Sequence, residues 1–174
     1  MMHYTHTGEK RIYYLTIMNS NADTIKLFYE SFQNLNAESM VSHYGKDVIF
    51  SDPAFGQLIG ERASNMWKML LSSQKGKQFE VVPSNIIATD TGGTAHWQAT
   101  YIFSQTGRKV VNEVDAHFKI VNGKIVAHTD SFNLHKWARQ AMGIKGMLLG
   151  GTNFFKKKLQ AQTNKMLDSW DQKQ

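Results

Sequence analysis

The sequence predicts an α+β fold in which helices come first and a curved antiparallel sheet follows. Three observations lead to this class. Residues 20–72 carry apolar side chains at helical spacing. Residues 79–134 form long runs with strand-like alternation, separated by sequences typical of tight turns. The chain then returns to a helical pattern, which continues to residue 170.

Two helices are expected before the first strand. Ser20 or Asp23 can cap the first helix. Its apolar residues recur at helical spacing and are Ile25, Phe28, Tyr29, Phe32 and Leu35. Asn36 can cap a short second helix over residues 37–44, which Gly45 would end.

The segment that follows, residues 48–60, holds the main candidate for chemistry. It begins as a strand and breaks at Asp52, because Pro53 lacks a backbone donor and holds the preceding residue in an extended conformation. A third helix is predicted over residues 61–72. A carboxylate at the end of a buried strand is well placed to act as a base. Because aspartate before proline is also a frequent turn initiator, the local pattern favours a turn role for Asp52.

A meander of long strands is predicted next. The expected strands cover residues 79–88, 94–104, 109–121 and 124–134. Pro83 predicts either an edge position or a bulge in the first of them. Asn122-Gly123 is the strongest hairpin signal in the chain, so the last two strands should pair directly.

The C-terminal part is expected to be a helical tail. A short helix over residues 136–142 should lead through a glycine-marked loop into a helix over residues 153–170. Its apolar stripe, which should pack on the domain or on a second subunit, comprises Phe155, Leu159, Met166 and Trp170. Gln162 and Thr163 interrupt the pattern of a membrane-lying helix. We therefore divide the chain into an N-terminal extension (1–18), one domain (19–140) and the tail (141–174).

Composition narrows the class of protein. With 174 residues, 41% of them hydrophobic, the chain can bury a core, and it has no cysteine for disulfides or thiolate metal sites. No apolar run approaches the roughly 18 residues of a membrane span, so we expect a soluble, cytoplasmic protein. The net charge of +6 raises nucleic acid as a partner, but the one dense basic run, Lys156–Lys158, fits a solvated helix face. We expect neither nucleic acid nor membrane as a partner, and no cofactor.

Alternation along the last two predicted strands gathers polar and apolar side chains on shared faces. One face of the last strand carries Val126, His128, Asp130, Phe132 and Leu134, and one face of the preceding strand carries Glu113, Asp115, His117 and Lys119. Acids and histidines among bulky apolar groups suit a pocket, although the second set fits a solvent face equally well. A metal site from His96, His117, His128 and Asp130 is conceivable, but no HExxH or HxH spacing supports it, so we expect no metal.

Taken together, the order of elements and several short motifs resemble the nuclear transport factor 2-like superfamily. Within it, residues 20–140 are most similar to SnoaL-like and ketosteroid-isomerase-related proteins. The motifs are Phe28-Tyr-Glu-Ser-Phe32, Val48-Ile-Phe-Ser-Asp-Pro-Ala-Phe-Gly56, Met66-Trp-Lys-Met-Leu70, His96-Trp97 with Tyr101, Thr106-Gly-Arg108, Asn122-Gly-Lys-Ile125 and His128-Thr-Asp-Ser-Phe132. The resemblance implies a cone-shaped sheet wrapped around the N-terminal helices, with a pocket inside, and often a dimer.

The resemblance also suggests roles for single residues. It places Asp52 where ketosteroid isomerase has its general base, and Asp115 where that enzyme has a protonated acid that donates a hydrogen bond. Phe132 corresponds to an aromatic wall of the pocket. The oxyanion-hole tyrosine corresponds to Phe28, which has no hydroxyl, and such a missing donor costs roughly 3 kcal/mol. The epoxide-hydrolase branch uses an Asp-Arg-Asp set, whose arginine position is Glu113 here.

The sequence is therefore consistent with two functions. The first is a cofactor-free enzyme, of the isomerase, cyclase or hydratase kind, acting on a small apolar carbonyl compound. Asp52 would remove a proton and Asp115 would donate a hydrogen bond, with support from Asp130 and His128. The expected pocket residues are Phe28, Phe55, Trp67, His117 and Phe132. The second is a non-catalytic binding module or dimeric scaffold, and in both cases we expect a homodimer.

Overall fold

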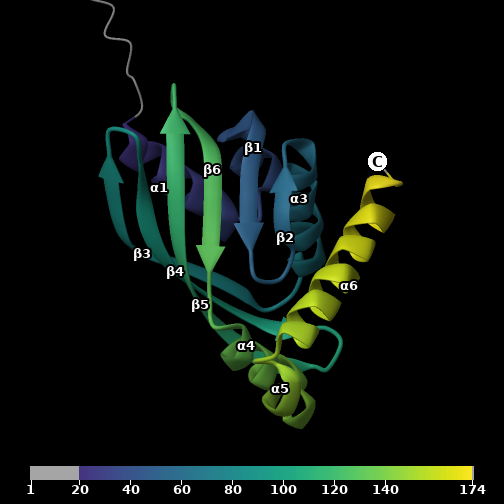
Figure 1. The fold of residues 1–174 in the computed structure, drawn as a ribbon. Helices are drawn as coiled ribbons and strands as arrows, with labels where there is room; N and C mark the ends of the chain where they lie inside the picture. Colours follow the sequence, from purple (N-terminus) through teal and green to yellow (C-terminus); the bar gives the residue numbers. More distant parts are fainter. Residues whose placement is uncertain (1–19, 174) are drawn as a thin grey trace, which may run out of the picture.

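The computed structural model describes residues 20–173, so the predicted extension over residues 1–18 lies outside the described residues. Within this range the α+β prediction is confirmed, with a six-stranded sheet that has helices on one face and at one end (Figure 1). The helices are α1 (Asn21–Gln33), α2 (Ala37–Ser42), α3 (Glu61–Gln74), α4 (Leu134–Met142), α5 (Ile144–Leu149) and α6 (Asn153–Asp171). The strands are β1 (Tyr44–Asp52), β2 (Gly56–Ile59), β3 (Phe79–Thr89), β4 (Gly92–Phe103), β5 (Arg108–Val121) and β6 (Lys124–Ser131).

The sheet has the strand order β2-β1-β6-β5-β4-β3. All neighbours are antiparallel except β1 and β6, which run parallel. The meander from β3 to β6 is therefore as predicted. Pro83 lies on the edge strand β3, and the register of β3 shifts between Ser84 and Ile87. Both features expected from Pro83 are thus present.

The N-terminal helix begins as its sequence predicts. The Ser20 hydroxyl accepts a hydrogen bond from the backbone N–H of Asp23, and the Asp23 carboxylate accepts one from the backbone N–H of Ser20. This capping box satisfies two backbone donors at the start of α1. The apolar stripe of α1 is buried against the sheet, with Phe28 fully inaccessible. Helix α1 therefore forms the centre of the core.

The region between α2 and α3 differs from the prediction. Helix α2 ends at Ser42, and Tyr44 opens β1, where it pairs with Ile125 of β6. Gly45 consequently lies inside a strand and does not end a helix. After Asp52 the chain folds back as β2, which pairs with β1 from Asp52↔Gly56 onwards. The sheet thus gains a two-stranded edge.

The glycine-rich segment that was expected to be a loop contains the helix α5. A side chain at Gly146 would place its Cβ 1.9 Å from the backbone oxygen of Ala138 in α4. Glycine there lets α5 pack directly on α4. The two helices form the lower end of the molecule in Figure 1, and α6 runs from this end back along α3.

Helix α6 packs on the domain, as its apolar stripe predicts. Leu167 is fully buried, and Arg62 of α3 forms ion pairs with Asp168 (2.7 Å) and Asp171 (3.0 Å). Met166, which was expected in the buried stripe, is instead 49% exposed. No helix in residues 20–173 is long and apolar enough to cross a membrane.

Candidate functional site

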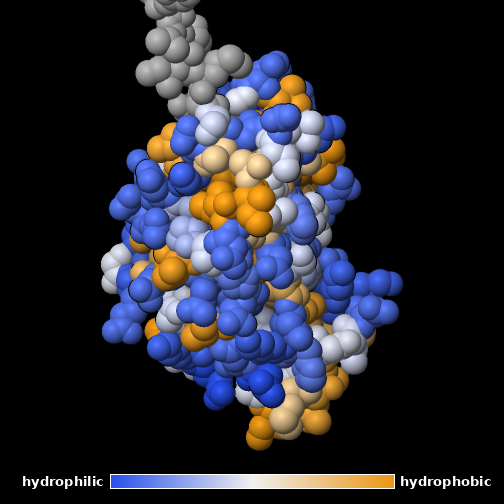
Figure 2. Space-filling view, turned by 90° about the vertical axis from the view of Figure 1, so that its left-hand side faces the viewer, coloured by the Kyte–Doolittle hydropathy of each residue, from blue (hydrophilic) through white to orange (hydrophobic). Residues whose placement is uncertain are grey.

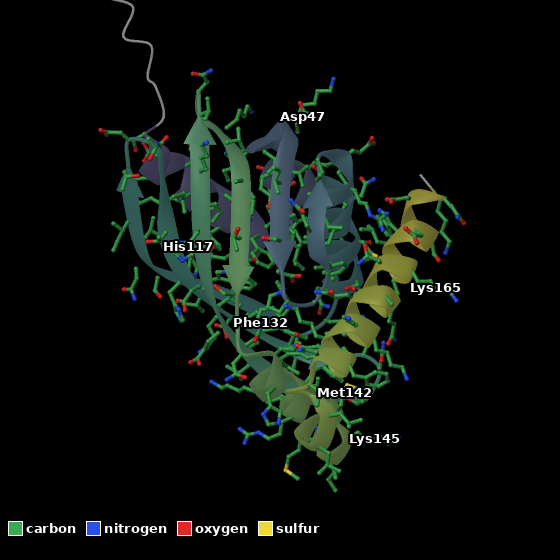
Figure 3. The ribbon with its side chains drawn as sticks, viewed as in Figure 1. Asp47, His117, Phe132, Met142, Lys145 and Lys165 are labelled. Carbon is green, nitrogen blue, oxygen red and sulfur yellow. The ribbon has the colours of Figure 1, made fainter. Side chains whose placement is uncertain are left out.

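A cavity of about 470 Å³ lies between the inner face of the sheet, α3 and the C-terminal helices. Its wall is mostly aromatic and aliphatic, and includes Phe50, Phe55, Trp67, Trp97, Phe132 and Trp137. Figure 3 shows Phe132 where β6 ends and the chain turns into α4. Two carboxylates, Asp52 and Asp130, also line the cavity. The site is therefore an apolar chamber with two acidic groups.

Asp52 is the last residue of β1, and its carboxylate shapes the turn that follows. The Oδ1 atom accepts hydrogen bonds from the backbone N–H groups of Ala54 (2.9 Å) and Phe55 (2.5 Å). This arrangement is the turn that Asp-Pro sequences favour. Because the same carboxylate lines the cavity, the two interpretations of Asp52, turn residue and site residue, do not exclude each other.

The surroundings of Asp52 favour its protonated form. Burial raises the pKa of Asp52 from its ordinary value of 3.8 to about 7, and the negative charge of Asp130 acts in the same direction. The backbone N–H groups of Phe55, Ala54 and Gly56 lower the pKa and only partly offset these effects. A carboxyl group with a pKa near 7 can both accept and donate a proton under neutral conditions.

Asp130 belongs to a buried chain of hydrogen bonds. The Tyr44 oxygen accepts from the indole N–H of Trp67 (2.7 Å), and the same hydroxyl is hydrogen-bonded to Nδ1 of His128 (2.7 Å). On the other side of the ring, Nε2 of His128 donates to the Asp130 carboxylate at Oδ1 (3.0 Å). The indole N–H of Trp97 donates to the same oxygen (3.4 Å). These donors hold Asp130 in place and stabilise its negative charge.

The loop that carries Asp52 is fixed from outside by α6. Gln160 donates a hydrogen bond to the backbone oxygen of Pro53 (3.2 Å), Thr163 to that of Ala54 (2.8 Å) and Asn164 to that of Phe55 (2.9 Å). One helix thus donates a hydrogen bond to each of three successive backbone carbonyl groups. The position of Asp52 consequently depends on the C-terminal tail.

Tyr101 of β4 presents a hydroxyl group to the cavity. Its oxygen accepts a hydrogen bond from the indole N–H of Trp137 (2.8 Å), and the side chain lines the cavity. Within residues 20–173, this is the only hydrogen bond of the Tyr101 hydroxyl. Its proton is therefore free for a bound molecule.

The structure does not bring Asp115 and His117 to the site. In β5, Ala116 pairs with Asp130 and Phe118 with His128, so the even-numbered residues share the inner face and the odd-numbered ones point outward. The Asp115 side chain is 73% exposed and bonds to Nδ1 of His96 (2.8 Å). The expectation that Asp115 faces Asp52 across a pocket was therefore wrong, and His117 is likewise exposed on the outer face.

Of the other predicted residues, some line the cavity and some are buried behind its lining. Phe55, Trp67 and Phe132 line the cavity as expected. Phe28 does not line it, because its ring is fully buried in the core, 5.4 Å from the centre of the His128 ring. His128 is 1% exposed and does not line the cavity, but it forms a hydrogen bond with Asp130, which does.

Sequence reasoning missed two residues of the site. Tyr44 was expected at the end of a helix, and no local signal indicates its bond to His128. Tyr101 lies on the face of β4 that also carries Trp97, and alternation alone did not tell which face of that strand is inside. A count of large side chains, which favours the Trp97–Tyr101 face as the buried one, could have found it.

The described residues offer no obvious metal centre. Within residues 20–173, no three His, Asp or Glu side chains are grouped so that they could hold an ion. Of the four residues considered for a metal site, His96 and His117 lie on the outer face, whereas His128 and Asp130 are buried. The two pairs are therefore on opposite sides of the sheet.

Comparison with known proteins agrees with this architecture. Residues 25–128 match the family model of the SnoaL-like domain. No curated protein sequence matches the chain.

Similar solved structures include a candidate polyketide cyclase from Xanthomonas campestris pv. campestris, with 20% identity, a TM-score of 0.56, and coverage of 70% of this chain and 96% of that one. An LEH-like epoxide hydrolase from M. tuberculosis has 21% identity, a TM-score of 0.55, and coverage of 75% and 90%. A nuclear transport factor 2-like protein of unknown function from Burkholderia pseudomallei K96243 has 15% identity, a TM-score of 0.59, and coverage of 70% and 97%. At these identities the likeness concerns the fold alone.

Proposed function

Because this chain belongs to the family of SnoaL-like domains, we propose that it is a cofactor-free enzyme that moves a proton on a small apolar carbonyl compound. The supporting observation is Asp52, a carboxyl group in an apolar cavity with its pKa raised to about 7. Isomerisation, cyclisation and hydration all share this proton transfer as a step. We place the activity in the cytoplasm, as the cysteine-free sequence leads us to expect.

The reaction begins when Asp52 takes a proton from the carbon next to the carbonyl group. We assign this step to Oδ2, because Oδ1 already accepts two backbone hydrogen bonds. The electron pair of the broken C–H bond forms an enolate, whose negative charge lies on the carbonyl oxygen. The protonated Asp52 then returns its proton to a different carbon or oxygen of the same molecule, which restores the carboxylate.

The enolate oxygen needs a hydrogen-bond donor, and Tyr101 is the group that we assign to it. Its hydroxyl lines the cavity with an uncommitted proton, while the bond from Trp137 fixes the position of its oxygen. A donor of this kind is worth roughly 10²–10³ in rate in comparable sites. In this proposal Tyr101 takes the role that the resemblance to ketosteroid isomerase suggested for Asp115.

The proposal is tested by proton exchange with small carbonyl probes. We expect wild type to catalyse exchange of the carbon-bound proton of a β,γ-unsaturated cyclic ketone or a 1,3-diketone in D₂O, followed by NMR. Asp52→Asn should abolish this exchange, and Tyr101→Phe should slow it by about 10²-fold or more. Asp115→Asn, which changes a carboxylate outside the cavity, should leave the rate unchanged.

A thermal-shift screen with the same probes separates catalysis from binding. If wild type and Asp52→Asn are stabilised equally and neither exchanges protons, the cavity is a binding site and the enzyme proposal fails. This result would favour the non-catalytic binding module. If Asp115→Asn lost as much activity as Asp52→Asn, the assignment of the proton transfer to the cavity would be wrong.

A further inference from the structure

The end of the molecule formed by α5 and the start of α6 exposes large apolar side chains. They are Ile144 (73% exposed), Met147 (49%), Leu148 (70%), Leu149 (49%) and Phe154 (68%). Figure 2 shows apolar side chains gathered at this end of the molecule, with hydrophilic side chains above them. We call these five residues the α5 tip. So many large aliphatic and aromatic groups on one short segment indicate an interaction surface.

The charge around the α5 tip has a single sign. Residues 131–167 contain no Asp or Glu and seven cations, which are Lys136, Arg139, Lys145, Lys156, Lys157, Lys158 and Lys165. Only Lys136 among them forms an ion pair within the described chain, with Glu113 at 2.6 Å. Lys145 and Lys156–Lys158 are exposed next to the tip in sequence. The partner of this surface should therefore be both apolar and negatively charged.

The cavity reaches the same surface. Leu149 and Phe154 belong to the α5 tip and also line the cavity, and so do Lys145 and Lys158. Figure 3 shows Lys145 and Met142 at the end of the molecule formed by α4 and α5. The exposed tip and the wall of the cavity thus share side chains.

We propose that the α5 tip and its lysines dock the protein on the surface of an anionic lipid bilayer. The aliphatic side chains would enter the boundary between headgroups and acyl chains, while the lysines contact the anionic headgroups. A second copy of this chain fits less well, because it would bring two sets of unpaired lysines together. The sequence-based expectation of no membrane partner rested on the lack of a membrane-spanning apolar run and on polar residues of α6. One of these, Thr163, bonds to Ala54 in the structure and lies outside the tip.

The experiment is flotation of the full-length chain with lipid vesicles. Vesicles of phosphatidylcholine alone are compared with vesicles of phosphatidylcholine and phosphatidylglycerol in equal parts. We expect wild type to float with the anionic vesicles at low salt and to be released in high salt, where exposed charges are screened. Absence of flotation with anionic vesicles would overturn the proposal.

Two variants separate the apolar and the charged contributions. Ile144→Asn/Leu148→Asn removes exposed apolar groups without changing the charge and should lower partitioning more than tenfold. Lys156→Gln/Lys157→Gln/Lys158→Gln should lower it on the order of 100-fold, because each lysine near an anionic surface contributes about fivefold. All the changed side chains are exposed, so circular dichroism should show the wild-type fold.

Each variant has a matched control elsewhere on the surface. Ile49→Asn/Ile59→Asn changes two exposed isoleucines of β1 and β2, and Lys26→Gln/Lys46→Gln/Lys119→Gln removes three exposed lysines of α1, β1 and β5. Both should float like wild type. Equal losses in variants and controls would mean unspecific charge attraction and would contradict a docking surface at the tip.

Two further outcomes are informative. If light scattering shows that Ile144→Asn/Leu148→Asn converts a dimer into a monomer and wild type does not float, the tip is an interface between copies and the proposal is wrong. Asp52→Asn should float like wild type, because docking does not involve the carboxylate. The docking proposal and the proposed enzyme function can therefore fail independently.

Discussion

At the scale of single residues, the two carboxylates of the cavity are made different by their neighbours. Asp130 accepts hydrogen bonds from His128 and Trp97, whereas Asp52 has only backbone donors and the repulsion of Asp130. Two acids with different surroundings in one cavity can have different roles. Asp130 can remain as a fixed negative charge, while Asp52 accepts and donates the proton. The hydrogen-bonded chain is therefore part of the site, although Tyr44 and His128 do not line the cavity themselves.

Asp52 makes the stability of the protein depend on pH. Between pH 3.8 and about 7, the folded protein keeps a proton on Asp52 that the unfolded chain has released, so stability falls as pH rises through this window. The upper limit is about 4 kcal/mol, because one pKa unit corresponds to about 1.4 kcal/mol. We expect the free energy of unfolding of Asp52→Asn to exceed that of wild type by about 2 kcal/mol at pH 8, since Asp52 is only half-buried and solvent screens part of the charge. Urea unfolding at pH 4 and pH 8 measures this gain. An equal difference at both pH values would contradict it.

The hydroxyl of Tyr44 should contribute to stability through the buried chain of hydrogen bonds. Tyr44→Phe keeps the ring but leaves the indole N–H of Trp67 without its acceptor and Nδ1 of His128 without its hydrogen-bond partner. We expect a loss of about 1–3 kcal/mol in the free energy of unfolding, measured in urea. Tyr29→Phe is the control, because the buried Tyr29 hydroxyl has no hydrogen-bond partner within residues 20–173. If the control is as damaging as Tyr44→Phe, the chain of bonds does not stabilise the fold.

The prediction of Asp115 as a site residue came from the resemblance to ketosteroid isomerase, whereas its outward position was left open by alternation along the strand. Alternation correctly groups residues that share a face, such as His128 with Asp130. It does not say which faces of neighbouring strands coincide, because this depends on register. Here Ala116 and not Asp115 lies beside Asp130, and only the paired structure provides that information.

At the scale of secondary-structure elements, α6 links the tail to the site. Asn164 donates to the backbone oxygens of Phe55 (2.9 Å) and Gln160 (2.8 Å) and accepts a bond from Arg62 (3.0 Å). We expect Asn164→Ala to lower stability by about 1–3 kcal/mol and to speed hydrogen exchange at the N–H groups of Ala54 and Phe55. Exchange followed by NMR measures this effect.

The matched control for Asn164→Ala is Ser169→Ala. Within residues 20–173, the exposed Ser169 side chain bonds only to the backbone oxygen of Lys165, one turn back in the same helix. This variant should leave exchange in the Asp52 loop unchanged. Equal acceleration in both variants would mean that α6 unfolds as a whole and does not hold the loop through Asn164.

Long elements with a strong pattern could be predicted, whereas short ones depended on tertiary contacts. The hairpin from β5 to β6 follows from Asn122-Gly123, and α1 follows from its cap and apolar stripe. Helix α5 was missed because its glycines suggest a loop. In the structure Gly146 serves close packing against Ala138, a reason that no local pattern contains. The four-residue strand β2 was missed because its pairing with β1 defines it.

At the scale of the whole molecule, the two sides of the sheet have different surroundings. The inner face is covered by α1 and α3, whereas no helix in the described part of the chain covers the outer face of β5 and β6 in Figure 1. That outer face carries Glu113, Asp115 and His117. The fold class could be predicted because the order of helices and strands limits how they can pack. With the described helices on one face of the sheet, the other face is left uncovered.

We expect the uncovered face to pair two copies of the chain, because the lysines beside the α5 tip oppose self-association at that end of the molecule. Light scattering should then give twice the chain mass of 19.8 kDa. His96→Glu should shift the equilibrium toward the monomer, since it adds a negative charge beside Asp115 on both copies and replaces the bond between these side chains (2.8 Å). Gln172→Glu adds the same charge beyond α6 and should leave the mass unchanged. A monomeric wild type, or equal effects of the two substitutions, would contradict a dimer through this face.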